Sequence, residues 1–103
     1  MKDIHEIFTT FKKEFPGIHA KNEALGKEIL DVAAVSLPEK VRCLIKIAAS
    51  SASHHPLALE THIARAREAG ATDVEIEHTL LLVLQTLGFP TFMESYSVLK
   101  NMK

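Results

Sequence analysis

Residues 72–90 read TDVEIEHTLLLVLQTLGFP and contain the strongest helical signal of the chain. Thr72 followed three residues later by Glu75 is a capping box, which marks a helix start. Gly88 and Pro90 mark the end of that helix. The apolar residues between Ile76 and Leu87 cover nearly the whole circumference, which is typical of a helix buried on all sides. Either a central position in the chain's own fold or a contact between subunits could bury it, and we favour the contact.

Three further helices are predicted before residue 54. Asp3 with Glu6 indicates the start of the first, which Pro16-Gly17 ends, and a second follows over residues 19–35 without a strong cap. Ser36-Leu37-Pro38-Glu39 combines a capping box with a proline in the first turn, so a third helix opens there. The apolar stripes are Ile4, Ile7, Phe8, Phe11 and Phe15 in the first helix, and Ala24, Leu25, Ile29 and Val32, facing inward, in the second.

The remaining sequence predicts a helix on each side of residues 72–90. His54-His55-Pro56 interrupts the third helix, because a residue before proline is pushed out of the α region. Pro56 suits the first position of the next helix, which ends at Gly70. Thr91 with Glu94 predicts the cap of the last helix. No stretch alternates with period two, so we predict an all-α fold of six helices in a single domain, residues 1–103.

The composition predicts which kinds of partner the protein lacks and where in the cell it works. Of the 103 residues, 47% are hydrophobic and 24% charged, as in globular proteins, and the net charge of −1 predicts no nucleic-acid partner. The longest apolar run, residues 80–84, is too short to span a membrane. The start of the chain has no apolar signal region, and the single cysteine excludes an internal disulfide. We therefore expect a cytoplasmic protein without a membrane partner.

Four segments resemble the conserved region of the carboxymuconolactone decarboxylase family. They are residues 38–50, 56–62 and 66–76, and the closing Gly88-Phe89-Pro90, within a resemblance that covers about residues 32–100. The resemblance implies an alkylhydroperoxidase D-like helical domain that needs no organic cofactor. It also implies a homo-oligomer, either a trimer or a hexamer, and we favour the hexamer.

The resemblance carries over only one functional residue unchanged. The peroxidase branch of the family uses Cys-x-x-Cys-x-x-x-His, and His62 matches its histidine. His55 and Ala58 stand at the two cysteine positions, and Cys43 stands at the position of a relay glutamate. The branch needs two thiols, so we expect no thiol peroxidase activity. The decarboxylase branch places carboxylates near the histidine, and Ala58 is not one.

His62 and His55 are the candidate catalytic residues. His62 shares a helical stripe with Ala58, Leu59, Ile63 and Ala66, so its ring should face inward. Burial would lower the pKa of its imidazole and keep it a neutral acid or base, while the alternative is a core histidine bonded to one backbone carbonyl. His55 occupies the cap position before Pro56, where a helix start favours a bound carboxylate. The alternative there is a surface cap.

The other candidate positions suggest no metal and no redox chemistry. Cys43 occupies the relay position, but a single cysteine is more simply a small buried apolar residue. His55 and His62 lie about 10.5 Å apart along a helix, too far for one zinc ion, so we predict no metal site. Two functions remain: a lyase-like enzyme in which His62 and His55 act on a small carboxylated, lactone or keto compound bound near His55 and Ala58, or a non-catalytic oligomer that binds a small molecule.

Overall fold

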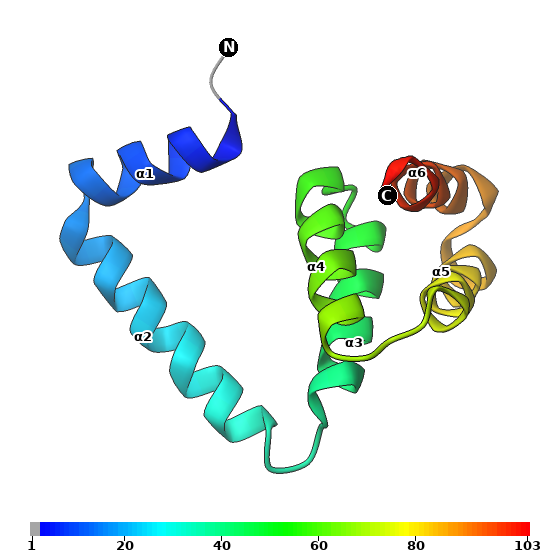
Figure 1. Ribbon diagram of the computed structural model, residues 1–103, viewed down its shortest axis with the longest axis horizontal. Helices are drawn as coiled ribbons and strands as arrows, with labels where there is room; N and C mark the ends of the chain where they lie inside the picture. The colour runs from blue at the N-terminus through cyan, green and yellow to red at the C-terminus, as the bar shows by residue number, and fades with distance from the viewer. Residues whose placement is uncertain (1–2) are drawn as a thin grey trace. The chain divides into compact units, whose positions relative to one another are not determined.

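The computed structural model describes residues 3–103, which form six α-helices and no strand (Figure 1). This confirms the predicted all-α class and the six helices. The chain divides into two compact units, Met1–Ser36 and Leu37–Lys103, named here unit 1 and unit 2. The helices are α1 (Ile4–Glu14) and α2 (Pro16–Ala33) in unit 1, and α3 (Glu39–Ala52), α4 (Pro56–Glu68), α5 (Asp73–Leu87) and α6 (Phe89–Asn101) in unit 2.

Unit 1 consists of two helices joined at Phe15. The predicted cap of α1 is confirmed, because the carboxylate of Asp3 accepts a hydrogen bond of 2.9 Å from the backbone N–H of Glu6. The predicted start of α2 at residue 19 is wrong, since the helix begins at Pro16. Proline suits the first helical position, where its missing N–H is not needed and its fixed φ is already helical.

None of the described residues of unit 1 is buried. The rings of Phe8 and Phe11 pack edge-on against His19, with centroid distances of 5.3 and 6.4 Å, and hold the turn between the two helices. The stripe predicted to face inward along α2 has no core within unit 1, and Leu25 and Ile29 are 55% and 56% exposed.

Unit 2 contains the hydrophobic core. Helices α3 and α4 form a hairpin, and α5 and α6 complete the unit (Figure 1). The hydroxyl groups of Ser51 on α3 and Ser95 on α6, both buried, lie 2.5 Å apart and satisfy each other inside the apolar interior. The core cluster consists of Ile47, Leu59, Ile63, Ala66, Ala71, Ile76, Leu80, Phe92 and Leu99.

The start of α5 follows the capping-box prediction in full. The hydroxyl of Thr72 accepts a hydrogen bond of 3.1 Å from the N–H of Glu75, and the N–H of Thr72 donates one of 2.9 Å to the Glu75 carboxylate. The hydrogen bond from the Thr72 backbone, together with Lys40 at 3.0 Å, lowers the pKa of that carboxyl below its ordinary value. The exchange satisfies donors that a helix start otherwise leaves free.

The predicted capping boxes at Ser36 and at Thr91 are wrong. Helix α3 starts at Glu39 with Pro38 at the cap, so Ser36 lies too far upstream to bond the first turn. Helix α6 starts at Phe89 with Gly88 at the cap, which already places Thr91 inside the helix. Gly88 adopts a φ of 99°, a conformation that glycine reaches without strain and that lets α6 follow α5 directly.

Helix α5 is not buried on all sides within unit 2. Its buried face carries Ile76, Leu80 and Val83, whereas Leu81 and Leu82 are 48% and 65% exposed. The alternative of burial inside the chain's own fold is therefore not met by unit 2 alone. The alternative, contact with a second subunit, stays a prediction.

Candidate functional site

His62 lies on α4 and is half-buried at the edge of the core, beside the buried Leu59 and Ile63. The sequence predicted a fully inward ring, and the structure places it at the rim instead. Among the hydrogen bonds of residues 3–103, none involves the His62 imidazole, and the core-histidine alternative stays open.

Burial and two positive charges favour the neutral form of the His62 imidazole. Desolvation lowers its pKa below the ordinary value for histidine, and the charges of Lys46 on α3 and Arg65 on α4 lower the pKa further. Both effects disfavour a second positive charge at this place. The direction agrees with the expectation from the sequence. A neutral imidazole can accept a proton at one nitrogen and donate at the other.

Sequence reasoning missed Lys46 and Arg65. Among the residues that the structure describes, neither side chain forms an ion pair with a carboxylate, although four other pairs are present. Arg65 could have been found, because it lies three residues after His62 and so on the same helix face. Lys46 could not, because it approaches His62 only when α3 and α4 pair as a hairpin. Two unpaired cations whose charges act on the same imidazole favour a bound anion.

His55 occupies the predicted cap position of α4. Its N–H donates to the carbonyl of Ser50 at 3.0 Å, its own carbonyl accepts from Leu59 at 2.8 Å, and Pro56 takes the first helical position. The side chain is exposed and does not cap the helix. The first turn of α4 therefore lacks a side-chain cap, and the His55 ring is free to solvent.

The remaining candidate positions are Ala58 and Cys43, and neither carries a carboxylate that could relay a proton. Ala58 is half-buried one turn before His62 on α4, so both lie on one helix face. Cys43 on α3 is a free thiol, half-buried, and packs against the core. In residues 3–103, no group of three histidine, cysteine, aspartate or glutamate side chains is arranged to hold a metal ion.

His54 has a structural role that the sequence did not reveal. Its Nδ1 lies 3.1 Å from the carboxylate of Glu94, so it ties the turn between α3 and α4 to α6. The backbone of His54 adopts a φ of 57°, which is unusual for a residue other than glycine. The His54 side chain is therefore used in the contact with Glu94 on α6.

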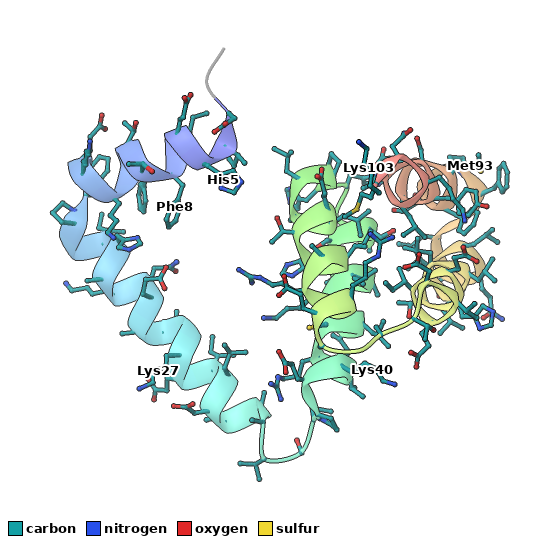
Figure 2. All side chains as sticks on the ribbon, viewed as in Figure 1. His5, Phe8, Lys27, Lys40, Met93 and Lys103 are labelled. Atoms are coloured by element: carbon teal, nitrogen blue, oxygen red, sulfur yellow. The ribbon has the colours of Figure 1, made fainter. Side chains whose placement is uncertain are left out.

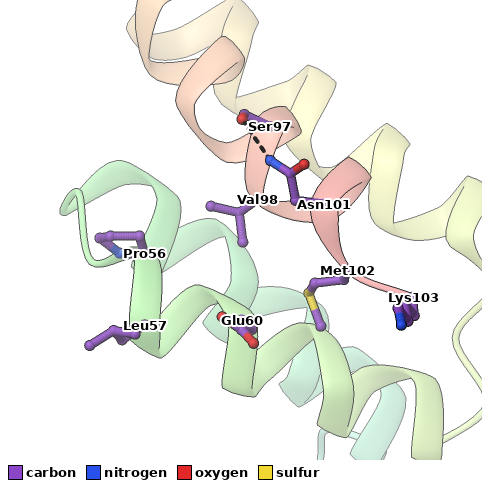
Figure 3. A pocket seen from close by; sticks show the side chains of 8 residues that line it. All are labelled: Pro56, Leu57, Glu60, Ser97, Val98, Asn101, Met102 and Lys103. Carbon is purple, nitrogen blue, oxygen red and sulfur yellow. Dashed lines mark hydrogen bonds between the residues drawn. The ribbon is translucent and has the colours of Figure 1, made fainter. Parts of the chain in front are cut away.

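A shallow cavity of about 430 Å³ lies between α4 and α6, and Pro56, the residue after His55, is part of its lining (Figure 3). The hydroxyl of Ser97 accepts a hydrogen bond of 3.3 Å from the amide of Asn101 there, which occupies part of its polar lining. Neither His55 nor His62 lines this cavity. Its lining consists of Pro56, Leu57, Glu60, Ser97, Val98, Asn101, Met102 and Lys103.

The family model described as the carboxymuconolactone decarboxylase family matches residues 16–101. The match spans α2 to α6 and starts earlier than the resemblance over residues 32–100, because it includes α2. No curated protein and no solved structure matches the chain. Over residues 3–103, no helix has both the length and the apolar character needed to cross a membrane.

Proposed function

The chain belongs to the carboxymuconolactone decarboxylase family, and we propose that it performs cofactor-free acid/base chemistry on a small carboxylated lactone or keto compound. His62 acts as the acid or base. The observation that carries this proposal is a half-buried imidazole whose pKa is lowered by burial and by the charges of the two unpaired cations Lys46 and Arg65. The reaction class is a lyase, as the family name implies.

The charges around His62 explain why the substrate should be an anion. A carboxylate placed between Lys46 and Arg65 would neutralise charges that now have no partner. The same carboxylate would favour the imidazolium and raise the pKa of His62. Substrate binding would thus bring the imidazole closer to the point where it exchanges a proton near neutral pH.

The other family positions receive smaller roles in this proposal. Ala58 carries only a methyl group on the helix face of His62 and is the proposed substrate contact there. His55, with the uncapped first turn of α4, offers N–H groups and a second imidazole to the far end of the substrate. Cys43 is the candidate relay position on the neighbouring helix.

A non-catalytic role is the second candidate. Lys46, Arg65 and His62 are sufficient to hold an anion, and no carboxylate forms an ion pair or a hydrogen bond with His62 among residues 3–103. Catalysis that moves a proton between two sites usually needs a second acid or base. If the substrate does not supply that group, the protein is a small-molecule-binding oligomer.

Nitrogen-detected NMR of the six imidazoles tests the proposal. The His62 signal should titrate below the ordinary histidine range, and adding lactones or keto acids should raise its pKa. His62→Gln, which keeps volume and a hydrogen-bonding group, should abolish turnover, whereas the matched control His78→Gln on α5 should not. A depressed pKa that ignores every ligand would overturn both candidates, while ligand response without turnover would favour the binding protein.

The proposal includes the absence of thiol peroxidase activity. Turnover through an internal disulfide needs two thiols, and Cys43 is the only cysteine of the 103 residues. Hydroperoxide consumption coupled to a dithiol should stay at the background rate. Activity that disappears in Cys43→Ser would contradict the proposal.

We also propose that the protein works in the cytoplasm as a homo-oligomer, a trimer or a hexamer. The lone thiol fits a reducing compartment. The large apolar side chains that remain exposed on α1, α2 and α5 fit contacts between subunits. Light scattering that shows a stable monomer of 11.4 kDa at micromolar concentration would exclude the oligomer.

A further inference from the structure

The cavity between α4 and α6, named here the α4–α6 cavity, is separate from His62, which does not line it. Its volume of about 430 Å³ is within the range of small-molecule sites in proteins, roughly 300–1,000 Å³. Val98 and Met102, both half-buried, are part of its apolar lining. The apolar part of a small ligand therefore has a surface to pack on.

Two opposite charges line the α4–α6 cavity. The carboxylate of Glu60 comes from α4, and the ammonium group of Lys103 belongs to the residues that follow α6 (Figure 2). Within residues 3–103, neither group forms an ion pair with the other or with a third residue. Figure 3 shows the side chain of Met102 between them. The cavity thus presents a negative and a positive group separated by apolar surface.

Ser97 and Asn101 add one free donor and one free acceptor to the lining. The Nδ2 group of Asn101 donates to the Oγ of Ser97 at 3.3 Å (Figure 3). This bond leaves the hydroxyl hydrogen of Ser97 as a donor and the Oδ1 of Asn101 as an acceptor. Both can bind a polar ligand without breaking an existing hydrogen bond.

One end of the cavity is fixed by a side chain at a position that usually carries glycine. Helices α3 and α4 end with the same pair of backbone hydrogen bonds, but the turn residue with positive φ is Gly70 after α4 and His54 after α3. Histidine is less stable than glycine in this conformation. Its side chain contacts Glu94 at 3.1 Å and so joins the chain just before Pro56 to α6, one turn before Ser97.

The other end of the cavity is fixed by Arg67. Its guanidinium donates to the backbone carbonyl of Lys103 at 3.1 Å and holds that residue against α4. The same guanidinium donates to both carboxylate oxygens of Asp73, at 2.9 and 3.3 Å, which restricts its orientation. Side-chain contacts at both ends therefore hold the two walls of the cavity together.

We propose that the α4–α6 cavity binds a small zwitterion with an apolar body, such as a free α-amino acid with an apolar side chain. The ammonium group of the ligand binds the carboxylate of Glu60 and the Oδ1 of Asn101. Its carboxylate binds the ammonium group of Lys103. Its apolar side chain packs on Val98 and Met102.

A zwitterion fits this lining better than a ligand with one charge. Lys103 would repel a simple amine bound at Glu60, and Glu60 would repel a simple carboxylate bound at Lys103. A molecule with both charges is attracted by both residues, so the arrangement selects against each singly charged analogue. The proposal is independent of the chemistry at His62.

NMR titration of the isotope-labelled full chain tests the proposal. L-leucine should shift the side-chain amide signal of Asn101 in a saturable way. Isopentylamine and 4-methylpentanoate are leucine without its carboxylate and without its ammonium group, and each should bind about tenfold more weakly or worse. Glu60→Gln should weaken leucine binding by a similar factor. Glu60 is exposed, so the variant should keep its helical circular dichroism.

Glu68→Gln is the matched control, because Glu68 is an exposed carboxylate on α4 that does not line the cavity. It should bind leucine as the wild type does. The absence of a saturable Asn101 shift at millimolar leucine would overturn the proposal, as would equal binding of the two analogues. An equal loss in Glu60→Gln and Glu68→Gln, or no loss in Glu60→Gln, would do the same. A response confined to the His62 imidazole would place leucine at the proposed anion site and exclude the α4–α6 cavity.

Discussion

Units 1 and 2 both consist of helices with apolar stripes, but only unit 2 has a buried core. Unit 2 packs four helices around a core in which Ile47, Ile63 and Leu80 are fully buried. Unit 1 has two well-patterned helices, and none of its described residues is buried. Most helical stability in proteins comes from packing an apolar face and little from propensity alone. The comparison teaches that an amphipathic stripe predicts a helix and its face, but not what covers that face.

The largest expected effect comes from separating the two units. A fragment of residues 37–103 should keep a cooperative thermal transition and high helicity, because its core is internal to it. A fragment of residues 1–36 should be mainly unfolded, since two helices without a core cannot offset the loss of chain entropy. Far-UV circular dichroism of both fragments measures this. A stable, helical residue 1–36 fragment would contradict the comparison.

Truncation of one leucine in each unit should give the next largest difference. Leu80→Ala removes a fully buried side chain from unit 2 and should cost about 2–5 kcal/mol of unfolding free energy. Leu25→Ala in α2, where the side chain is 55% exposed, should cost less than about 1 kcal/mol. Urea denaturation at low protein concentration compares them. Equal losses would mean that Leu25 has a core partner.

The sequence predicted all six helices, but only some of their first residues. The differences arise from the residues next to each predicted cap. The Thr72–Glu75 box is used because nothing before it competes for the helix start. Ser36 has the same pattern, but Pro38 restricts Leu37 to extended conformations, and α3 begins only at Glu39. Thr91 fails because Gly88, at a φ of 99°, already turns the chain into α6. A short motif cannot show which of two neighbouring caps the chain uses.

The sequence predicted the site residues that lie close together along the chain, but not the one that a different helix contributes. His62, Ala58 and His55 follow from the family motif and the predicted start of the helix, and the structure places Ala58 and His62 on α4 and His55 at its cap. Lys46 depends on the pairing of two helices, which periodicity does not encode. The depth of His62 is also a tertiary property, so a stripe that predicts an inward ring gives a half-buried one.

Removing the side-chain cap of α5 at Thr72 or of α1 at Asp3 should change stability less, and the two units should respond differently. Thr72→Ala should lower the unfolding free energy of unit 2 by about 0.5–2 kcal/mol, because the N–H of Glu75 loses its acceptor. Asp3→Ala removes an equivalent bond from α1. It should leave the cooperative transition of unit 2 unchanged and reduce only helicity. Thermal denaturation followed by near-UV and far-UV circular dichroism distinguishes the two outcomes.

The smallest expected effect is a pH dependence located at His62 in unit 2. In the folded chain, burial and the charges of Lys46 and Arg65 lower the pKa of His62, whereas the unfolded chain has the ordinary value of about 6.5. Between the folded pKa and about 6.5, the unfolded state therefore binds more protons, so stability falls as the pH decreases through that window. Above it, this contribution is fully present.

His62→Gln should remove that slope, because glutamine does not titrate, while His78→Gln on the exposed side of α5 should keep it. The slope should be shallow, since the half-exposed ring is partly screened by water. A bound carboxylate should flatten it as well, because an anion beside Lys46 and Arg65 raises the folded pKa of His62 toward the unfolded one. Urea midpoints measured every half pH unit, with and without a keto acid, check both parts. If His62→Gln keeps the wild-type dependence of unfolding free energy on pH, a group other than His62 titrates in that window. The proposed anion site would then lose its electrostatic basis.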